Sequence, residues 1–256
     1  MSPNNPSPVG IEPPSHRVLA LFDFDWSLVE GDTDKQTISL SPASAAKQLE
    51  LSGTVQWTDL QHELLGEMHE QGITKVDIEN ALKLMVMEPD MLEALHILHT
   101  AGVEMVIISD SNTFYIDTIL KHYNIAHYFS KIITNPAHFD ASGRLCVRRY
   151  EDGTAHGCSI CPVNLCKGKE LIEYVKERGN FTRMIYLGDG LNDFCPATKL
   201  HNGTLLCRKN HSLYRLLQDG AGCSMKVEDP WKLLKAQVVY WDNAAQVLEY
   251  VQGHFA

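Results

Sequence analysis

Two carboxylates follow the first strongly apolar run of the chain. Asp23 and Asp25 come directly after Val18–Phe22 and are separated by one residue, in the segment LFDFDWS. In a strand or its immediate continuation, residues two apart point the same way, so the two carboxylates share one small space. Like charges held together need a cation, and a Mg²⁺ ion with oxygen ligands satisfies that need. A third carboxylate from GDGLND, residues 188–193, would complete the shell of such an ion.

Three apolar runs are expected to position these carboxylates. Residues 18–22, 103–108 and 184–187 are predominantly apolar, as is typical of parallel strands buried on both faces, and each run ends in polar residues. Two Asp residues that are separated by one residue are, on their own, more typical of a solvated turn. Their place after a buried strand favours a ligand site instead. Because ligands of open α/β sheets bind beyond the carboxyl ends of the strands, we expect the three ends to converge.

Between the strands the apolar spacing becomes helical. Residues 91–98 and 116–123 each present one apolar face, which gives the order strand, helix, strand. Residues 32–71 and 74–87 also show helical spacing, with no strand signal between them. This insert leaves the core after the first strand and returns before the second, so it can close over the site. We therefore predict an α/β fold, a Rossmann-like parallel sheet core with a small α-helical cap.

The expected division of the chain follows from that topology. It comprises a disordered proline-rich tail (1–17), a catalytic core (18–31 and 88–256) and a helical cap (32–87). Within the core, residues 139–150 alternate around a turn, which predicts a hairpin, followed by a loop. Residues 205–206 and 238–239 predict edge strands, and 244–252 predict a closing helix.

Composition and charge exclude several classes of protein. Of the 256 residues 44% are apolar and 21% are charged, which supplies enough apolar material for a folded core. The formal charge of −10 repels the phosphates of nucleic acids and of anionic membranes, so neither is an expected partner. Residues 1–17 lack the apolar stretch of a signal peptide, and no segment approaches about 18 uninterrupted apolar residues. The seven cysteines, crowded between Cys146 and Cys166, indicate reduced thiols. We expect a soluble, cytoplasmic protein.

Four segments in a fixed order carry a resemblance to a known superfamily. They are LFDFDWS, VIISDSN, LCKGKEL and LGDGLNDF, and they span residues 18–197. With these segments the chain resembles the haloacid dehalogenase superfamily of aspartate-nucleophile phosphatases. The resemblance implies Mg²⁺-dependent hydrolysis of a phosphate ester through an aspartyl-phosphate intermediate.

The resemblance assigns the nucleophile, the acid and the metal ligands. Asp23 is the nucleophile, and Asp25 donates a proton to the leaving oxygen and later takes one from water. Mg²⁺ is bound by Asp23, by the carbonyl of Asp25 and by Asp189.

The resemblance also assigns the groups around the phosphate. The Ser109 hydroxyl and the Lys167 ammonium stabilise the charge of the phosphoryl group, and Asp193 orients metal-bound water or Lys167. Lys169 is the alternative cation, but the context CKG favours Lys167. Ser109 also suits a helix cap, as do the three residues that follow it.

Further phrases narrow the resemblance to one group of phosphatases. DFDWSLVEGDTD, ISDSNTFYI, CPVNLCKG and GDGLNDFCP are similar to the phosphoethanolamine/phosphocholine phosphatase family and to its pyridoxal-phosphate and thiamine-phosphate phosphatase relatives. In that family, acidic residues at the positions of Asp34 and Asp110 face the substrate's amine. Such a carboxylate pair attracts a cationic head group. The alternative is that Asp34 only starts a helix and Asp110 only caps one.

Trp26 departs from the polar or charged residue that this family usually has at its position. Either its indole lines the entrance and meets a quaternary ammonium by cation–π attraction, or it packs against the cap. Packing is the favoured interpretation.

A compact set of soft ligands precedes Lys167. His156, Cys158, Cys161 and Cys166 form the pattern H-x-C-x₂-C-x₄-C, which can hold a structural Zn²⁺ that braces the loop. Only one cysteine pair has finger-like spacing, and the usual distant second pair is missing, so the pattern favours buried, reduced thiols.

The sequence thus predicts a phosphomonoesterase acting on a small-molecule phosphate ester that carries an amine. Phosphocholine and phosphoethanolamine lead, followed by pyridoxal 5′-phosphate and thiamine monophosphate. A catalytically silent binding module is the alternative from another class, and the intact nucleophile, acid and metal residues argue against it. A phosphotransferase or a dehalogenase would use the same scaffold, but Asp25 favours phosphoryl chemistry because dehalogenation has no alcohol to protonate. No pattern in the sequence specifies an oligomeric state.

Overall fold

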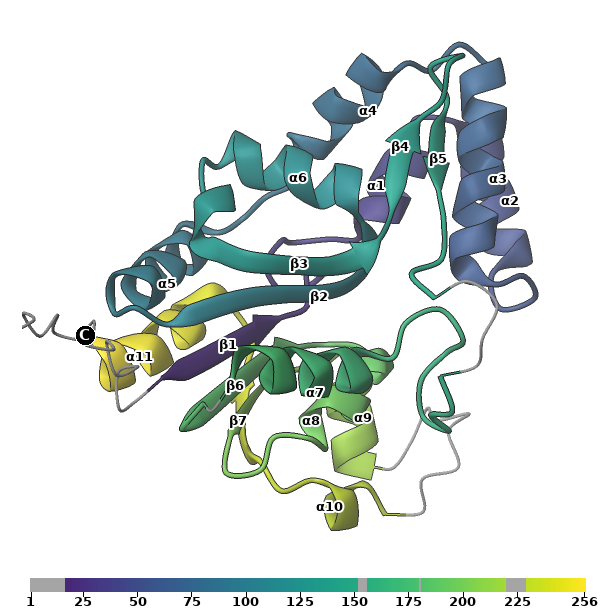
Figure 1. Ribbon diagram of the computed structural model, residues 1–256. Coiled ribbons are helices and arrows are strands. Elements are labelled where there is room, and N and C mark those ends of the chain that lie inside the picture. Colours follow the sequence, from purple (N-terminus) through teal and green to yellow (C-terminus); the bar gives the residue numbers. More distant parts are fainter. Residues whose placement is uncertain (1–16, 152–155, 180, 220–228) are drawn as a thin grey trace, which may run out of the picture.

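A six-stranded parallel sheet forms the centre of the molecule (Figure 1). The computed structural model describes residues 17–151, 156–179, 181–219 and 229–256, so the predicted tail lies outside the described residues except for Arg17. The strands are β1 (Val18–Phe22), β2 (Glu104–Asn112), β3 (Phe129–Asn135), β6 (Arg183–Gly188), β7 (Thr204–Arg208) and β8 (Gln237–Trp241). Their order is β3-β2-β1-β6-β7-β8, and every neighbouring pair is parallel.

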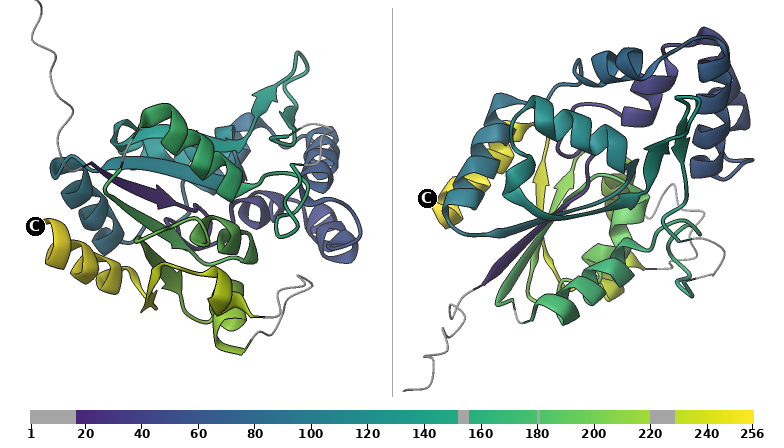
Figure 2. Two further views of the ribbon diagram at one scale, coloured as in Figure 1. Left: turned by 60° about the horizontal axis from the view of Figure 1, so that its bottom comes forward. Right: turned by 45° about the horizontal axis from the view of Figure 1, so that its top comes forward.

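Helices cover both faces of this sheet (Figures 1 and 2). One face packs against α5 (Pro89–Thr100), α6 (Thr113–His122) and α11 (Ala244–Phe255). The other face packs against α7 (Lys167–Arg178), α8 (Phe194–Ala197) and α9 (Ser212–Asp219). Three short elements complete the core, η1 (Ala126–Tyr128), η2 (Leu191–Asp193) and α10 (Pro230–Leu233). No helix in the described part of the chain has the length and apolar character needed to span a bilayer.

Alternating side chains of β1 explain why its sequence is continuously apolar. Leu19 and Leu21 belong to the apolar cluster on the α7 side, whereas Ala20 and Phe22 belong to the cluster on the α5 side. Successive residues of a strand point to opposite faces, so a strand with helices on both faces needs apolar residues at every position. The strand therefore ends where the first carboxylate appears.

Four helices lie between β1 and α5, where the sequence predicted a helical insert. They are α1 (Thr33–Ile38), α2 (Pro42–Leu51), α3 (Trp57–Glu70) and α4 (Lys75–Leu82). They stand at one end of the sheet beside the hairpin of β4 (Ala137–Phe139) and β5 (Leu145–Val147) (Figure 1). Arg144 from the hairpin turn donates a hydrogen bond of 3.0 Å to the carbonyl of His62 on α3. The hairpin thus supports the helical insert from the core, and the exact domain division at residues 32 and 87 stays a prediction.

The structure corrects three details of the predicted sheet. The run at 205–206 belongs to β7, which pairs with β6 and β8 and is therefore internal, whereas β8 is an edge strand as expected. β2 does not stop at residue 108 but continues to Asn112 after a shift in its pairing with β3. β3 was not predicted, because this edge strand exposes Ser130 and Lys131 and so lacks an apolar run.

A matched pair of leucines tests the assignment of the core. Leu95 on α5 is fully buried, while Leu49 on α2 keeps 77% of its surface exposed. Leu95→Ala should lower the free energy of unfolding by about 2–5 kcal/mol, since it leaves a cavity, and Leu49→Ala should change it by less than about 0.5 kcal/mol. Urea denaturation of both variants measures the difference. Equal effects would show that α5 does not pack as described.

Candidate active site

The carboxyl ends of β1, β2 and β6 meet at one edge of the sheet. Phe22, the last residue of β1, is paired with Ile107 on β2 and with Leu187 on β6. The backbone N–H of Asp23 then donates a hydrogen bond of 2.9 Å to the carbonyl of Leu187. Asp23 is therefore held directly beside Asp189, which follows β6, as parallel pairing requires.

A buried ammonium joins two of the predicted site residues. Lys167, the first residue of α7, is fully buried, and its Nζ lies 2.8 Å from Asp23 Oδ2 and 2.8 Å from Asp193 Oδ1. Burial alone would lower the pKa of Lys167, but the carboxylates of Asp193 and Asp23 outweigh it and raise that pKa well above its ordinary value. Lys169, the alternative cation, is partly exposed and pairs with Glu151 instead. The structure thus brings Lys167, and not Lys169, to Asp23.

Asp193 is held by hydrogen bonds to both of its oxygens. Oδ1 accepts from Lys167 and from the hydroxyl of Tyr186 at 2.7 Å, and Oδ2 accepts from the backbone N–H groups of Asp189 at 3.0 Å and Gly190 at 2.9 Å. Gly188 permits this close packing, because a Cβ there would lie 2.6 Å from Asp193 Oδ2. Since both oxygens are already used, Asp193 is suited to orienting Lys167 and the turn after β6.

Three carboxylates form a compact set of oxygen donors. One oxygen each of Asp23, Asp189 and Asp193 lie within 4.8 Å of one another. Burial, followed by the neighbouring charges of Asp193 and Asp189, raises the pKa of Asp23 well above its usual range, and Lys167 opposes only part of that rise. An additional cation would relieve this repulsion, and an all-oxygen donor set fits Mg²⁺. Asp189 Oδ2 lies 2.8 Å from His211 Nδ1, so its second oxygen is the one suited to a metal.

Asp25 lies one residue beyond Asp23 in a separate hydrogen-bonded group. Its Oδ1 accepts from the backbone N–H of Thr33 and its Oδ2 from the hydroxyl of Thr33, both at 3.1 Å. Removal from water, and then the charges of Asp32 and Asp34, raise the pKa of Asp25 well above its usual range. This shift favours the protonated form of the carboxyl group, which suits a proton donor.

Ser109 is buried near the carboxyl end of β2, and it is not the cap of the next helix. Asn112 caps α6, because its side-chain oxygen accepts from the backbone N–H groups of Phe114 and Tyr115 at 3.1 Å. The Ser109 Oγ instead accepts from the backbone N–H of Ser111 at 3.2 Å, which leaves its hydroxyl proton available.

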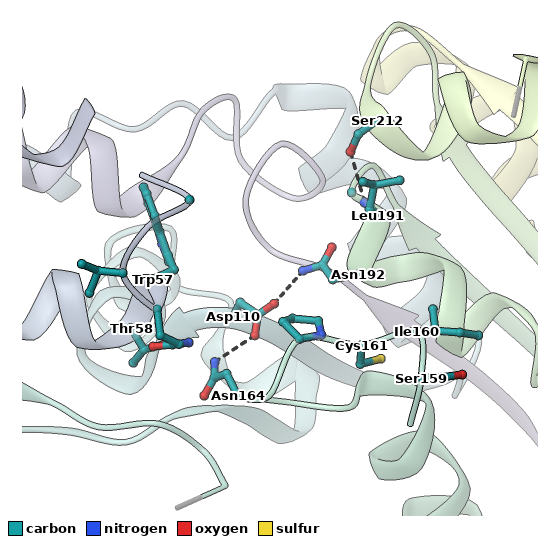
Figure 3. Close-up of a pocket in the computed structure, with 15 residues that line it drawn as sticks. Trp57, Thr58, Asp110, Ser159, Ile160, Cys161, Asn164, Leu191, Asn192 and Ser212 are labelled. Atoms are coloured by element: carbon teal, nitrogen blue, oxygen red, sulfur yellow. Dashed lines mark hydrogen bonds between the residues drawn. The ribbon is translucent and has the colours of Figure 1, made fainter. Parts of the chain in front are cut away.

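A cavity of about 940 Å³ opens beside these residues, between α3, the loop before α7 and the turn after β6. Asp110 lines it and is held by two amides, since Asn164 Nδ2 donates to Oδ1 at 3.1 Å and Asn192 Nδ2 to Oδ2 at 2.7 Å (Figure 3). Trp57, at the start of α3, lines the cavity as well. Its Nε1 donates to Asp34 Oδ2 at 2.6 Å.

Neither acidic residue of the predicted amine site caps a helix. Asp32 is the cap of α1, and Asp34 is buried behind Trp57 in the first turn. Burial, and then the charge of Asp32, raises the pKa of Asp34 to about 8, and Asp110 is also among the charges that raise it. Asp34 and Asp110 are thus close enough to interact. Asp110 lines the cavity, and Asp34 lies behind Trp57.

The ring contacts described for Trp26 are with the core and not with the helical insert against which it was expected to pack, and 38% of its surface is exposed. Its ring centroid is 5.4 Å from that of His211, and the guanidinium of Arg208 lies 5.9 Å from it. Arg208 also donates a hydrogen bond of 2.7 Å to the Trp26 carbonyl. The aromatic face therefore already meets a cation of the protein, and Trp26 is not among the residues that line the cavity.

Sequence reasoning did not single out six residues that support the site. They are Thr33, Trp57, Asn164, Asn192, Tyr186 and His211. Asn164 and Asn192 stood inside the quoted phrases CPVNLCKG and GDGLNDFCP, where a short polar side chain beside a motif was the available signal. His211 and Trp57 are distant from every motif, and only folding brings them in.

Comparison with solved structures identifies the class of protein. A HAD family hydrolase from Salmonella enterica serovar Typhi matches with a TM-score of 0.63 at 14% identity, over 93% of this chain and 73% of the other. A phosphoserine phosphatase from T. onnurineus matches with a TM-score of 0.56 at 14% identity, over 95% and 98%. At such identities the likeness establishes the fold, which is that of haloacid dehalogenase-like hydrolases.

Comparison of sequences then identifies the family. The family described as "Putative Phosphatase" matches residues 18–255. The chain is 33% identical over 237 residues to a thiamine phosphate phosphatase-like protein of Arabidopsis thaliana (90% of this chain, 92% of the other). It is 31% identical over 250 residues to pyridoxal phosphate phosphatase PHOSPHO2 of Bos taurus (92% and 98%), and 35% identical over 211 residues to inorganic pyrophosphatase 2 of Arabidopsis thaliana (79% and 75%). The chain belongs to the putative phosphatase family and is a haloacid dehalogenase-like phosphatase, which confirms the resemblance seen in its four motifs.

Two lysines two residues apart test the buried ion cluster. Lys167→Met should lower the free energy of unfolding at pH 7 by about 3–5 kcal/mol, because Asp23 and Asp193 lose their shared cation. Lys169→Met, which breaks a partly exposed pair, should change it by less than about 1 kcal/mol. Burial raises the pKa of Asp23, and Lys167 opposes part of that rise, so in Lys167→Met this carboxyl group binds a proton more readily when folded, and lowering the pH from 7 to 5 should restore part of the loss. Denaturant unfolding at both pH values measures this, and equal losses for the two variants would contradict the arrangement.

Proposed function

We propose that this protein is a Mg²⁺-dependent phosphomonoesterase that hydrolyses a small amine-bearing phosphate ester through an aspartyl-phosphate on Asp23. The observation that carries the proposal is the Lys167 ammonium between Asp23 and Asp193, beside Asp189, at the carboxyl end of the central strand. Bound Mg²⁺ would neutralise the charge of the phosphoryl oxygens and of Asp23, and the ligands for it are Asp23, Asp189 and the carbonyl of Asp25.

Asp23 is the nucleophile of the proposed reaction. One oxygen of its carboxylate attacks phosphorus, the ester P–O bond breaks, and an acyl phosphate forms on Asp23. Water then attacks the same phosphorus, the bond from Asp23 to phosphorus breaks, and inorganic phosphate leaves. The backbone N–H of Asp23 donates to the carbonyl of Leu187, and Asp23 Oδ1 accepts from the backbone N–H of Phe24 at 2.7 Å, so the carboxylate keeps one orientation in both steps.

Asp25 moves the proton in both steps. Its raised pKa favours the protonated form, which gives its proton to the leaving alcohol oxygen in the first step. As a carboxylate it then takes a proton from the attacking water. The two hydrogen bonds from Thr33 hold its carboxyl group in one orientation, and Thr33 Oγ1 is itself 2.8 Å from Ser111 Oγ.

Lys167 and Ser109 stabilise the phosphoryl group during transfer. The Lys167 ammonium is preorganised by Asp193, so no reorganisation is needed as charge develops on the phosphoryl oxygens. The free hydroxyl proton of Ser109 supplies a further donor at the same sheet edge.

The cavity between the helical insert and the core supports an amine-bearing substrate. Asp110 lines it and Asp34 lies behind its Trp57 wall, so both acidic residues of the proposed amine site stand at this cavity. A phosphate monoester with a cationic group on its alcohol would bring that cation near Asp110, as phosphocholine and phosphoethanolamine would. The insert would act as a cap that limits access to small molecules.

Cationic heteroaromatic esters are the second candidate substrates. The cavity has room for more than a choline group, and Trp57 supplies an aromatic wall beside the carboxylates. Relatives named for pyridoxal phosphate and thiamine phosphate are similar over almost their entire length. Pyrophosphate, named for another relative, would bring a second anionic group towards Asp110, which opposes its binding.

Replacement of the nucleophile tests the mechanism. Asp23→Asn should lower phosphate release by at least about 1,000-fold while the far-ultraviolet circular dichroism stays unchanged, because the nucleophile is lost and few contacts change. The surface variant Asp117→Asn is the control and should keep full activity. The assay covers phosphocholine, phosphoethanolamine, pyridoxal 5′-phosphate, thiamine monophosphate and pyrophosphate, with and without EDTA. Substantial turnover by Asp23→Asn, or full activity in EDTA, would refute the mechanism.

The raised pKa of Asp34 tests the amine site. With a pKa of about 8 this carboxyl group is mostly neutral at pH 7 and becomes an anion as the pH rises through 8. The ratio of kcat/KM for phosphocholine to that for glycerol phosphate should therefore rise from pH 7 to pH 9, and the rise should be absent in Asp34→Asn. At pH 9 the variant should lose about thirtyfold or more in that ratio.

This substitution is cleaner than the corresponding one at Asp110. Asparagine at residue 34 keeps an oxygen that can accept from Trp57 Nε1. Asparagine at residue 110 would instead set an amide donor against the donors of Asn164 or Asn192. A ratio that does not change with pH in the unsubstituted protein, or equal losses on both esters, would mean that Asp34 serves only the scaffold.

A further inference from the structure

Four cysteine sulfurs converge on one point at the start of α7. Cys158 and Cys161 come from the loop before this helix, Cys166 is its N-cap, and Cys195 lies on α8. The four Sγ atoms all lie within 4.8 Å of one another, and none of the four cysteines forms a disulfide. Cys195 Sγ is 3.7 Å from that of Cys158 and 3.8 Å from that of Cys166.

We propose that Cys158, Cys161, Cys166 and Cys195 bind one structural Zn²⁺ ion as a closed four-thiolate site. With zinc–sulfur bonds of about 2.3 Å, the sulfurs of a tetrahedral site are about 3.8 Å apart, which matches the spacings to Cys195. Four sulfur donors leave no open position for a water or a substrate, so the ion serves structure and not catalysis. This inference does not depend on the proposed function.

His156 is not part of this site, although sequence spacing made it a candidate. Its Nε2 donates to the carbonyl of Pro162 at 2.7 Å, and its Nδ1 accepts from the backbone N–H of Cys158 at 3.2 Å. Both ring nitrogens are therefore used in shaping the loop that presents Cys158. The missing fourth ligand is Cys195, which is 29 residues beyond Cys166 and had no spacing signal.

Simple packing of reduced thiols does not explain the cluster. Cys158 and Cys161 are only partly buried, whereas a thiol used as a small apolar group is usually fully buried. The sulfurs face one another across three chain segments. Gly168 allows that approach, because a Cβ there would lie 2.6 Å from Cys195 Sγ.

The charges around the cluster suit a thiolate–zinc group. Cys166 caps the N-terminus of a twelve-residue helix, where the helix dipole favours a thiolate. Lys169, Lys176 and Lys199 line the depression that also contains Cys158 and Cys166, together with one acid, Glu173. A zinc ion with four thiolates carries two negative charges, which these ammonium groups complement.

The ion would position both halves of the Lys167–Asp193 pair. Cys166 directly precedes Lys167, and Cys195 follows Asp193 by two residues. Linking the two cysteines fixes the start of α7 against α8, so that Lys167 Nζ stays 2.8 Å from Asp193 Oδ1. Cys161 also lines the substrate cavity, so the same ion would hold that wall.

Metal analysis of the full-length chain tests the proposal. Protein expressed in zinc-replete medium and purified without a metal-affinity column should contain about one zinc per chain by mass spectrometry, after Mg²⁺ is removed by mild EDTA dialysis. Growth with Co²⁺ in place of Zn²⁺ should give the sulfur-to-cobalt charge-transfer band and the intense visible bands of tetrahedral thiolate ligation. Zinc content below about 0.1 per chain, with all thiols reactive or with a disulfide among the four, would overturn the proposal.

Matched variants locate the ion. Cys158→Ser, Cys161→Ser and Cys195→Ser should each reduce zinc at least about fivefold, while the control Cys146→Ser on β5 should keep about one equivalent. Zinc retained equally in all variants would place the metal elsewhere and refute the site. If a cluster variant fails to fold, the unsubstituted protein is titrated with a mercurial reagent while zinc release is measured. Zinc release that is complete when four thiols have reacted supports the site. Zinc release without thiol consumption contradicts it.

Discussion

A buried ammonium shared by two carboxylates is the interaction on which the site depends. Lys167 begins α7, Asp23 follows β1 and Asp193 lies between β6 and α8, so a single cation joins three elements that are distant in the chain. Buried charges are tolerated only when they are paired and fully hydrogen-bonded, and Asp193 meets this condition with two donors on each oxygen. With Asp189 included the group keeps a net negative charge, which suits a divalent cation.

The proposed phosphate site and the cavity beside it have different structural origins. The proposed phosphate site lies at the ends of β1, β2 and β6, which the regular pairing of the sheet fixes in position. Much of the cavity wall comes from the start of α3 in the insert and from the loop before α7, both of which lie outside the sheet. Substitutions there can change the alcohol that is accepted without disturbing the phosphate chemistry. Relatives that are 31–35% identical to this chain are named for thiamine phosphate, pyridoxal phosphate and pyrophosphate.

Much of the fold could be predicted because its central strands have helices on both faces. The requirement for apolar residues at every position allowed β1 and β6 to be predicted. Helical periodicity allowed the insert after β1 to be predicted. The alternating pattern predicted a hairpin, and the antiparallel pairing of β4 with β5 confirms it. β3 was not predicted, because an edge strand needs only part of its surface buried. The extension of β2 was not predicted either, because polar residues after an irregular pairing resemble a loop.

The sequence by itself determined the reaction class and the identity of the groups at the sheet edge, because a nucleophile, an acid and metal ligands must be particular residue types at short, fixed spacings. Tertiary structure alone decided which partners these groups have. His211 beside Asp189, Trp57 beside Asp34 and Cys195 beside Cys166 are 22, 23 and 29 residues apart in the chain. No local pattern links such pairs, since their contact results from how α3, α8 and the residues after β7 pack around the sheet.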